Sequence, residues 1–250
     1  MRRLVRQDLT KPVLLYLGRK QAEVNGGSDV GQTWDRARRT KSIRHVASVL
    51  KSMSGVRNRC MYCDDSRGTQ IDHYWPKVRF PDRSFDWSNM LWLCGGCNLT
   101  KGDRFDLDAH GNPLLLNPTS DDPWEYLFFE PATGIITARY CPHTGSPNPR
   151  AAYTTDPEVL PLNIESVTEG RRRTCRSLRR AVERFLQAAG SPAMDHAETE
   201  RSLISEIKDH DDYGLTSWYF LKDGRESPPF SQFRNQFANV WQRVVDSLSP

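Results

Sequence analysis

Two closely spaced cysteine pairs enclose the stretch that decides the fold: Cys60-Met61-Tyr62-Cys63 and Cys94-Gly95-Gly96-Cys97. Two Cys-x-x-Cys knuckles of this kind are typical of a tetrahedral four-thiolate zinc site. Such a shell leaves no position for water, so it predicts a structural ion whose binding is coupled to folding of the enclosed loop. Two disulfides, or free thiols that pair by chance, are the alternatives.

The N-terminal sequence and the two remaining cysteines indicate the cellular compartment of the protein. No basic stretch followed by an apolar one opens the sequence, which argues against a secreted, oxidised chain and predicts a cytoplasmic protein. Cys141 and Cys175 lack a partner at knuckle spacing, so we expect them to be ordinary thiols. No apolar run approaches the roughly 18 residues that a membrane span needs, and no membrane partner is expected.

An aspartate–histidine pair lies between the knuckles, in Ile71-Asp72-His73-Tyr74-Trp75-Pro76. A neutral imidazole beside a carboxylate suits metal-assisted hydrolysis, because one group activates water while the other holds the cation. The dipeptide alone is common, and a single histidine is more often structural. Asn89 and Asn98 follow in order, however, and a carboxylate with an amide oxygen, waters and phosphate oxygens matches the coordination of Mg²⁺.

Taken together, these residues resemble the HNH endonucleases of the ββα-metal fold. The resemblance covers about residues 57–105 and rests on three segments in order: Asp72-His73-x-x-Pro76, Asn89-x-Leu91 and Cys94-x-x-Cys97-Asn98-x-x-Lys101-Gly102. It implies a hairpin of two strands, with His73 near the end of the first, followed by a short helix from about Asn98. Asn98 stands where the third letter of the motif is usually His, so the motif is an H-N-N variant.

The same resemblance implies a role for each residue. His73 is the water-activating base, Asp72 and Asn98 are ligands of a catalytic Mg²⁺ or Mn²⁺, and Asn89 braces the catalytic loop through hydrogen bonds. Lys101 takes the place of a phosphate-contacting lysine. The implied reaction is hydrolysis of nucleic-acid phosphodiesters, with DNA as the expected substrate. Activity is expected to fall below about pH 6.5, the ordinary pKa of histidine, as His73 is protonated.

Basic residues gather in two clusters that flank this core, although the net charge of the whole chain is only +4. Residues 1–59 carry fourteen Lys or Arg against four acidic residues. The second cluster lies in an expected helix and consists of Arg171, Arg172, Arg173, Arg176, Arg179, Arg180 and Arg184. Such clusters are typical of a surface that binds a nucleic-acid backbone. A solvated helix face, or a docking surface for an acidic partner, explains them equally well.

The sequence as a whole predicts an α+β fold, in which a small ββα-metal nuclease core with structural zinc is embedded in a mostly helical chain. We expect four segments: a basic arm and helix (1–56), the nuclease core (57–106), a loop and hairpin extension (107–160) and a helical region (161–250). Residues 1–20 are expected to be extended, and 124–129 and 134–139 to be paired strands. The expected helices are 34–53, 164–189, 194–210 and 230–248, the last with an aromatic stripe that packs internally.

A narrower resemblance concerns the flanks of the core, at Lys11-Pro12, residues 124–134 and Pro228-Pro229-Phe230-Ser231. There the chain resembles bacterial HNH effectors of the Septu and retron-associated antiphage systems. The resemblance implies a partner ATPase, and a nuclease that is restrained until the ATPase or another sensor releases it. The rival functions are a non-catalytic zinc-ribbon module that binds nucleic acid, and an adaptor with a decayed nuclease site. The zinc-ribbon module explains the cysteines and basic clusters, but not the ordered His73, Asn89 and Asn98. The adaptor with a decayed site is distinguished from a nuclease by a cleavage assay.

Overall fold

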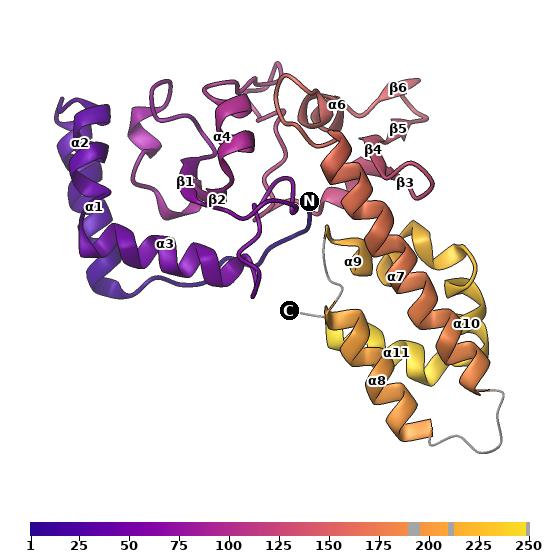
Figure 1. The fold of residues 1–250 in the computed structure, drawn as a ribbon. Coiled ribbons are helices and arrows are strands. Elements are labelled where there is room, and N and C mark those ends of the chain that lie inside the picture. Colours follow the sequence, from indigo (N-terminus) through magenta and orange to yellow (C-terminus); the bar gives the residue numbers. More distant parts are fainter. Residues whose placement is uncertain (190–195, 210–212, 249–250) are drawn as a thin grey trace. The chain divides into compact units, whose positions relative to one another are not determined.

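A computed structural model describes residues 1–189, 196–209 and 213–248, which form two compact units (Figure 1). The first contains Arg3–Phe128 and Thr137–Leu162, and the second contains Phe129–Ile136 with the described residues of Asn163–Pro250. Helices and short two-stranded sheets occur together, which confirms the predicted α+β class. The predicted segment boundaries after residues 56 and 106 fall inside the first unit and remain predictions.

Three helices precede the first cysteine: α1 (Lys11–Asn25), α2 (Val30–Ala37) and α3 (Lys41–Met53). The prediction of an extended arm over residues 1–20 is wrong from Lys11 onward, because Pro12 in the first turn starts a helix there. The single helix predicted over 34–53 is two helices. Thr40 separates them by capping α3, where its hydroxyl accepts a hydrogen bond from the Ile43 amide at 3.4 Å.

The predicted hairpin and helix form the centre of the first unit. Strand β1 (Gln70–His73) pairs antiparallel with β2 (Met90–Leu93), with His73 opposite Met90 and Gln70 opposite Leu93. Helix α4 (Gly95–Lys101) follows β2 directly. Two 3₁₀ turns, η1 (Pro81–Arg83) and η2 (Trp87–Asn89), lie in the connection between the strands. The ββα order is confirmed, and α4 begins three residues earlier than expected.

Arg6 in the N-terminal arm holds the turn that leads into β2. Its guanidinium lies over the ring of Trp87 at 4.7 Å and donates to the carbonyl oxygens of Trp87 at 2.8 Å, and of Ser88 and Met90 at 3.1 Å. Burial lowers the pKa of Arg6 to about 10, opposed by the charge of Asp86. Part of the basic excess in the first 59 residues is therefore structural.

The loop and hairpin extension holds short elements. They are α5 (Pro123–Tyr126), β3 (Leu127–Glu130), β4 (Ile135–Ala138), β5 (Tyr140–Cys141), β6 (Ser146–Pro147) and α6 (Pro149–Thr155). Strands β3 and β4 pair, as predicted, but β3 is shorter than expected. The reason is that Asp122 accepts a hydrogen bond from the Trp124 amide at 3.1 Å and starts a helical turn where a strand was predicted.

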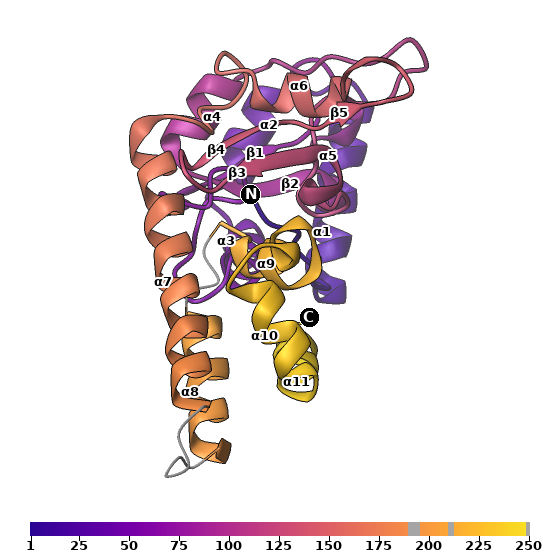
Figure 2. The same cartoon turned by 90° about the vertical axis from the view of Figure 1, so that its right-hand side faces the viewer.

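The second unit is helical (Figure 2). It contains α7 (Glu165–Ala189), α8 (His196–Asp209) packed along α7, α9 (Leu215–Leu221), the turn η3 (Asp223–Glu226), α10 (Phe230–Gln236) and α11 (Ala238–Leu248). The first two confirm predicted helices where residues are described; residues 194, 195 and 210 of the second prediction lie outside the described part. The last predicted helix is two, because Phe237 leaves the helical region at φ −131° and ψ 52°.

The aromatic stripe of α10 and α11 packs internally, as predicted. Phe185 of α7 has its ring centroid 5.1 Å from that of Phe233 and 5.2 Å from that of Phe237, and Trp241 lies 4.8 Å from Phe220. Burying such aromatic side chains together is the main stabilisation available to a small helical unit. None of the helices in the described residues is both long and apolar enough to cross a membrane.

Candidate functional site

The four cysteines of the two knuckles meet in the interior of the first unit. Their sulfur atoms all lie within 4.8 Å of one another, and none of them is in a disulfide. Four sulfurs that bind one zinc ion at about 2.3 Å are separated by about 3.8 Å. The distance between the sulfurs of Cys63 and Cys94 is 3.9 Å, so the cluster has the donors and the spacing for a single metal ion.

Backbone geometry brings the two knuckles together. The Met61 amide donates to the Trp92 carbonyl at 2.9 Å and the Thr69 amide to the Leu93 carbonyl at 2.8 Å, so the loop with the first knuckle is tied to β2. Cys94 caps α4, and its sulfur accepts from the Cys97 amide at 3.4 Å. Hydrogen bonding from Cys60 lowers the pKa of Cys63 to about 7, which favours the thiolate, the form that binds metals.

His73 lies at the end of β1 with 4% of its surface exposed. Its Nε2 is 2.9 Å from the carbonyl oxygen of Ser84. A carbonyl only accepts hydrogen bonds, so Nε2 carries the proton of the neutral ring and Nδ1 is left as an acceptor. The ring of Trp34 contacts the imidazole edge-on, with 4.5 Å between centroids, which fixes the ring plane. This is the tautomer that a base acting through Nδ1 requires.

The electrostatics around His73 correct the pH dependence expected from the sequence. The pKa of His73 is lowered to about 3, mainly by burial and also by the positive charges of Lys77 and Lys101, while the hydrogen bond to Ser84 acts in the opposite direction. The imidazole is therefore neutral throughout the range around pH 6.5, where an ordinary histidine becomes charged. The acid loss of activity expected near pH 6.5 is displaced to more acidic conditions.

Lys101 is buried beside Asp72, which corrects its assignment as a phosphate contact. The Lys101 ammonium is fully buried and lies 2.9 Å from Asp72 Oδ2 and 2.8 Å from the His73 carbonyl oxygen. A buried ammonium needs such compensation, because leaving it unpaired away from water is costly. Burial raises the pKa of Asp72, although Lys101 acts in the opposite direction. Lys101 therefore links α4 to β1 and orients the aspartate.

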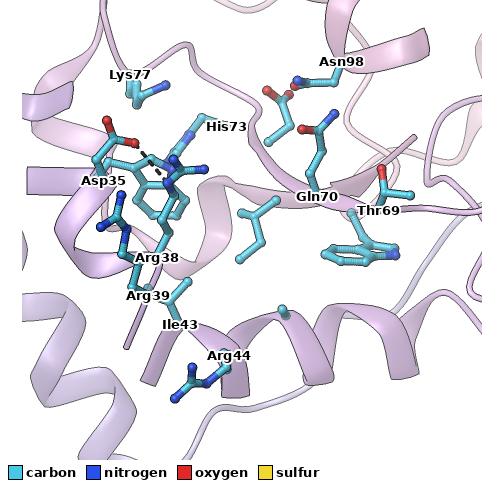
Figure 3. Close-up of a pocket in the computed structure, with 15 residues that line it drawn as sticks. Asp35, Arg38, Arg39, Ile43, Arg44, Thr69, Gln70, His73, Lys77 and Asn98 are labelled. Atoms are coloured by element: carbon cyan, nitrogen blue, oxygen red, sulfur yellow. Dashed lines mark ion pairs between the residues drawn. The ribbon is translucent and has the colours of Figure 1, made fainter. Parts of the chain in front are cut away.

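Asp72, His73 and Asn98 all face the same open space. They line a cavity of about 690 Å³, which Figure 3 draws, and also a smaller one of about 350 Å³. Asp72 and His73 come from β1, and Asn98 comes from α4. The three residues predicted to do chemistry are thus brought together by two elements of one small motif. A carboxylate and an amide oxygen at one cavity are donors that a hard divalent cation prefers.

Asn89 lines neither cavity, and its side chain instead holds the loop that follows His73. The side chain is 2% exposed. Its Oδ1 accepts from the Trp75 amide at 2.6 Å, and its Nδ2 donates to the carbonyl oxygens of Trp75 at 3.1 Å and Arg83 at 2.9 Å. These bonds hold both ends of the segment between His73 and Ser84. The geometry is that of a residue which braces the loop.

The arginine cluster of α7 lies in the second unit, and one member is internal. Arg171 is fully buried and donates to the Gly134 carbonyl at 2.9 Å and to Asn163 Oδ1 at 3.2 Å, which corrects its assignment to a nucleic-acid surface. Glu169 forms ion pairs with three others at 3.1 to 3.3 Å: Arg172, Arg173 and Arg176. Nucleic-acid binding by Arg172, Arg173, Arg176, Arg179 and Arg180 stays a prediction.

Sequence reasoning did not single out the basic residues that line the larger cavity. They are Arg38, Arg39, Arg44 and Lys77. The first three lie on or between α2 and α3, inside the stretch whose basic excess was noticed. The excess was the only available signal, because it does not tell which cations face the aspartate–histidine pair and which, like Arg6, are used in packing.

The depressed pKa of His73 gives a direct test of this site. We expect the imidazole carbon–proton signals of His73 to keep their neutral positions between pH 5 and pH 8, because burial and the two lysines disfavour the charged ring. The measurement is an NMR pH titration in which the His73 signals are identified by their loss in His73→Gln. A His73 signal that moves with a midpoint near pH 6.5 would contradict the buried, neutral ring.

Comparisons with known proteins agree with this geometry. The HNH endonuclease family model matches residues 60–104. The chain is similar to the Septu protein PtuB of Bacillus thuringiensis, with 32% identity over 88 residues that cover 33% of this chain and 32% of the relative. It is also similar to the Septu protein PtuB of Bacillus mycoides (strain KBAB4), with 30% identity over 121 residues that cover 36% of this chain and 40% of the relative. The matches span about a third to two fifths of these curated relatives. Residues 60–104 of this chain are therefore an HNH endonuclease domain.

Proposed function

We propose that this protein is a metal-dependent endonuclease that hydrolyses nucleic-acid phosphodiesters, with DNA as the substrate. One observation carries the proposal: Asp72, His73 and Asn98 line the same cavity inside the matched domain. A purely structural role for the motif gives no reason for a neutral imidazole, a carboxylate and an amide to share an open space. Hydrolysis needs all three.

The roles follow from the contacts. Nδ1 of His73 takes a proton from the attacking water, and the Ser84 carbonyl keeps the ring in the tautomer that leaves Nδ1 available. Asp72 and Asn98 would hold a Mg²⁺ or Mn²⁺ ion, which when bound neutralises charge on the phosphate and stabilises the departing oxygen. Lys101 holds the Asp72 carboxylate in place. Asn89 keeps the loop on which His73 depends.

The four cysteines would hold a structural zinc ion. The support is the donor set, four buried sulfurs in a cluster whose size suits the radius of a zinc–thiolate shell, with no fifth group required. Binding of such an ion contributes directly to the free energy of folding, because the unfolded chain offers no preformed site. The zinc would fix the first knuckle to the start of α4.

Removal of a single sulfur tests the zinc site. We expect the parent protein to contain about one zinc per chain and Cys97→Ser to lose it and unfold at a lower temperature. Metal analysis by mass spectrometry and thermal unfolding measure the two effects. Cys141→Ser is the matched control, because Cys141 is outside the cluster, and it should change neither. A zinc-free parent, or a Cys97→Ser variant with unchanged metal content, would refute the site.

Cleavage assays test the catalytic assignment. His73→Ala should lower the rate of cleavage by about 10²- to 10⁴-fold, the usual contribution of a general base, while binding of nucleic acid is retained. His110→Ala removes an exposed histidine that lines neither cavity and should leave the rate unchanged. The assay uses duplex DNA, single-stranded DNA and RNA in Mg²⁺ and in Mn²⁺, with EDTA as the blank.

Two outcomes of that assay would change the proposal. A His73→Ala protein that cuts as fast as the parent would show that His73 is not the base. A parent that binds nucleic acid in every condition but never cuts it would favour the rival function, a non-catalytic zinc-ribbon or adaptor module.

The biological setting is a second proposal. We infer that the nuclease is an antiphage defence effector that acts with a partner ATPase. The similarity to two Septu proteins PtuB supports it, together with the resemblance of the flanking segments to effectors of that kind. If it is correct, the chain should copurify with the ATPase encoded beside it, and its cleavage should depend on that partner. A chain that purifies alone and cleaves fully without any partner would contradict this inference.

A further inference from the structure

The larger cavity is not formed by the HNH domain alone. The domain contributes β1 from Thr69 to His73, with Lys77, Trp92 and Asn98. The opposite wall comes from α2, α3 and the residues between them, outside the matched residues 60–104. Both walls belong to the first compact unit. Anything that reaches the Asp72–His73–Asn98 group through this cavity therefore passes the N-terminal helices as well.

The charges of that cavity are unevenly balanced. Its two acidic residues are already paired: Asp35 with Arg38, with 3.0 Å between Oδ1 and Nε, and Asp72 with Lys101. Among the described residues, no ion pair involves Arg39, Arg44 or Lys77, which also line the cavity. The cavity consequently has more cations than carboxylates, and the Asp72 carboxylate that attracts Lys77 is already paired with Lys101.

The surplus cations are not equally placed. Figure 3 draws Arg39 and Lys77 on the same side of the cavity as His73, with Arg38 between them and held by Asp35. Arg44 is drawn at the bottom of the view, below Ile43 and away from His73. The positive charge of Lys77 is close enough to His73 to lower the pKa of its ring. Arg39 and Lys77 are therefore the two cations on the His73 side of this cavity that form no ion pair within the described residues.

We propose that Arg39 and Lys77 bind backbone phosphates on either side of the scissile one, so that the substrate strand lies between the N-terminal helices and the HNH domain. The inference rests on the proposed function. Cations that neutralise phosphates provide most of the sequence-independent affinity for nucleic acid, because bound counterions are released. A guanidinium can contact a phosphate through two parallel hydrogen bonds, and a lysine contacts it as a point charge. Arg38 contributes less, since Asp35 already compensates it.

The consequence is that the matched domain is an incomplete substrate site. Residues 60–104 contain the candidate base, the candidate metal ligands and Lys77, but Arg39 lies outside them. The α2–α3 wall would act as one half of a clamp whose other half is β1 and α4. Its residues would be substrate-positioning residues and would leave the chemistry to Asp72, His73 and Asn98.

Salt dependence of binding tests the proposal without relying on cleavage. All proteins carry His73→Ala, so that the substrate is not consumed. The cavity pair is Arg39→Gln/Lys77→Gln. The control pair is Arg36→Gln/Lys41→Gln, which removes the same charge from exposed residues of α2 and α3 that do not line the cavity. Affinity for a short DNA duplex, the matching single strand and the matching RNA is measured between about 50 and 200 mM salt. Over this range, affinity that depends on phosphate contacts falls steeply.

We expect the cavity pair to flatten the slope of log affinity against log salt by about 0.9 per lost duplex contact, or about 0.7 on a single strand, and the control pair to leave the slope nearly unchanged. The nucleic acid with the largest difference between the two pairs identifies the substrate class. Equal slopes for both pairs on all three nucleic acids would overturn the inference. Unchanged thermal unfolding confirms that each pair is folded.

The binding experiment tests the roles of Arg39 and Lys77 independently of whether the protein cleaves nucleic acid. Slopes are read from binding alone, so they decide the role of Arg39 and Lys77 even if the parent does not cleave. If the parent cleaves and the cavity pair, restored to His73, cleaves and binds like the control pair, only the clamp is wrong. A parent that does not cleave any of the three nucleic acids would instead remove the proposed nuclease activity.

Discussion

The convergence of four cysteine sulfurs is the constraint on which the rest of the first unit depends. Cys60 and Cys63 belong to the turn before β1, and Cys94 and Cys97 to the start of α4, so the cluster closes the motif at both ends. Asn98 follows Cys97 directly, and the sulfur cluster therefore decides where the amide of Asn98 stands relative to β1. Pairing of β1 with β2 fixes the position of His73, because it places His73 opposite Met90, four residues before Cys94.

A buried lysine connects the same two elements and also sets the electrostatics of the site. The Lys101 ammonium bridges the Asp72 carboxylate and the His73 carbonyl, so it ties α4 to β1 and contributes a positive charge in the interior. That charge stabilises an ionised aspartate and disfavours a charged imidazole at the same time. The charge of Lys101 thus favours the protonation states that the proposed hydrolysis would require from Asp72 and His73. This is a reason for a lysine at this position that does not involve touching a phosphate.

The sequence predicted residue types and their order, and the structure shows why it could not predict where long side chains point. The knuckles, the aspartate–histidine pair and Asn89 were found because their spacing is local. Lys101 and Arg171 were misplaced because either side chain can turn inward or outward, and the choice depends on tertiary neighbours. Arg171 turns inward because Gly134 approaches α7 closely: a Cβ there would lie 2.2 Å from the Thr168 carbonyl oxygen, and the Gly134 carbonyl accepts from the guanidinium.

The helix boundaries predicted between residues 34 and 53 were wrong for a related reason. Apolar residues recur through 34–53, but the capping hydroxyl of Thr40 divides the stretch. A periodic pattern does not reveal a cap when buried residues recur at helical spacing on both sides of it. The division matters for function. It places Arg38 and Arg39 in the short connection between α2 and α3, where they line the cavity instead of continuing along a helix surface.

Helix α3 shows how packing supports the frame of the candidate site. Its buried residues Ile43, Val46 and Leu50 recur at helical spacing, and the helix packs against β2. This contact gives a small two-stranded hairpin the apolar support that it lacks by itself, since isolated hairpins are marginally stable in water. The same packing holds the connection before α3 beside His73. A nuclease motif of 45 residues therefore requires the preceding helices twice: for the burial that keeps its strands paired, and for the positive wall that completes its cavity.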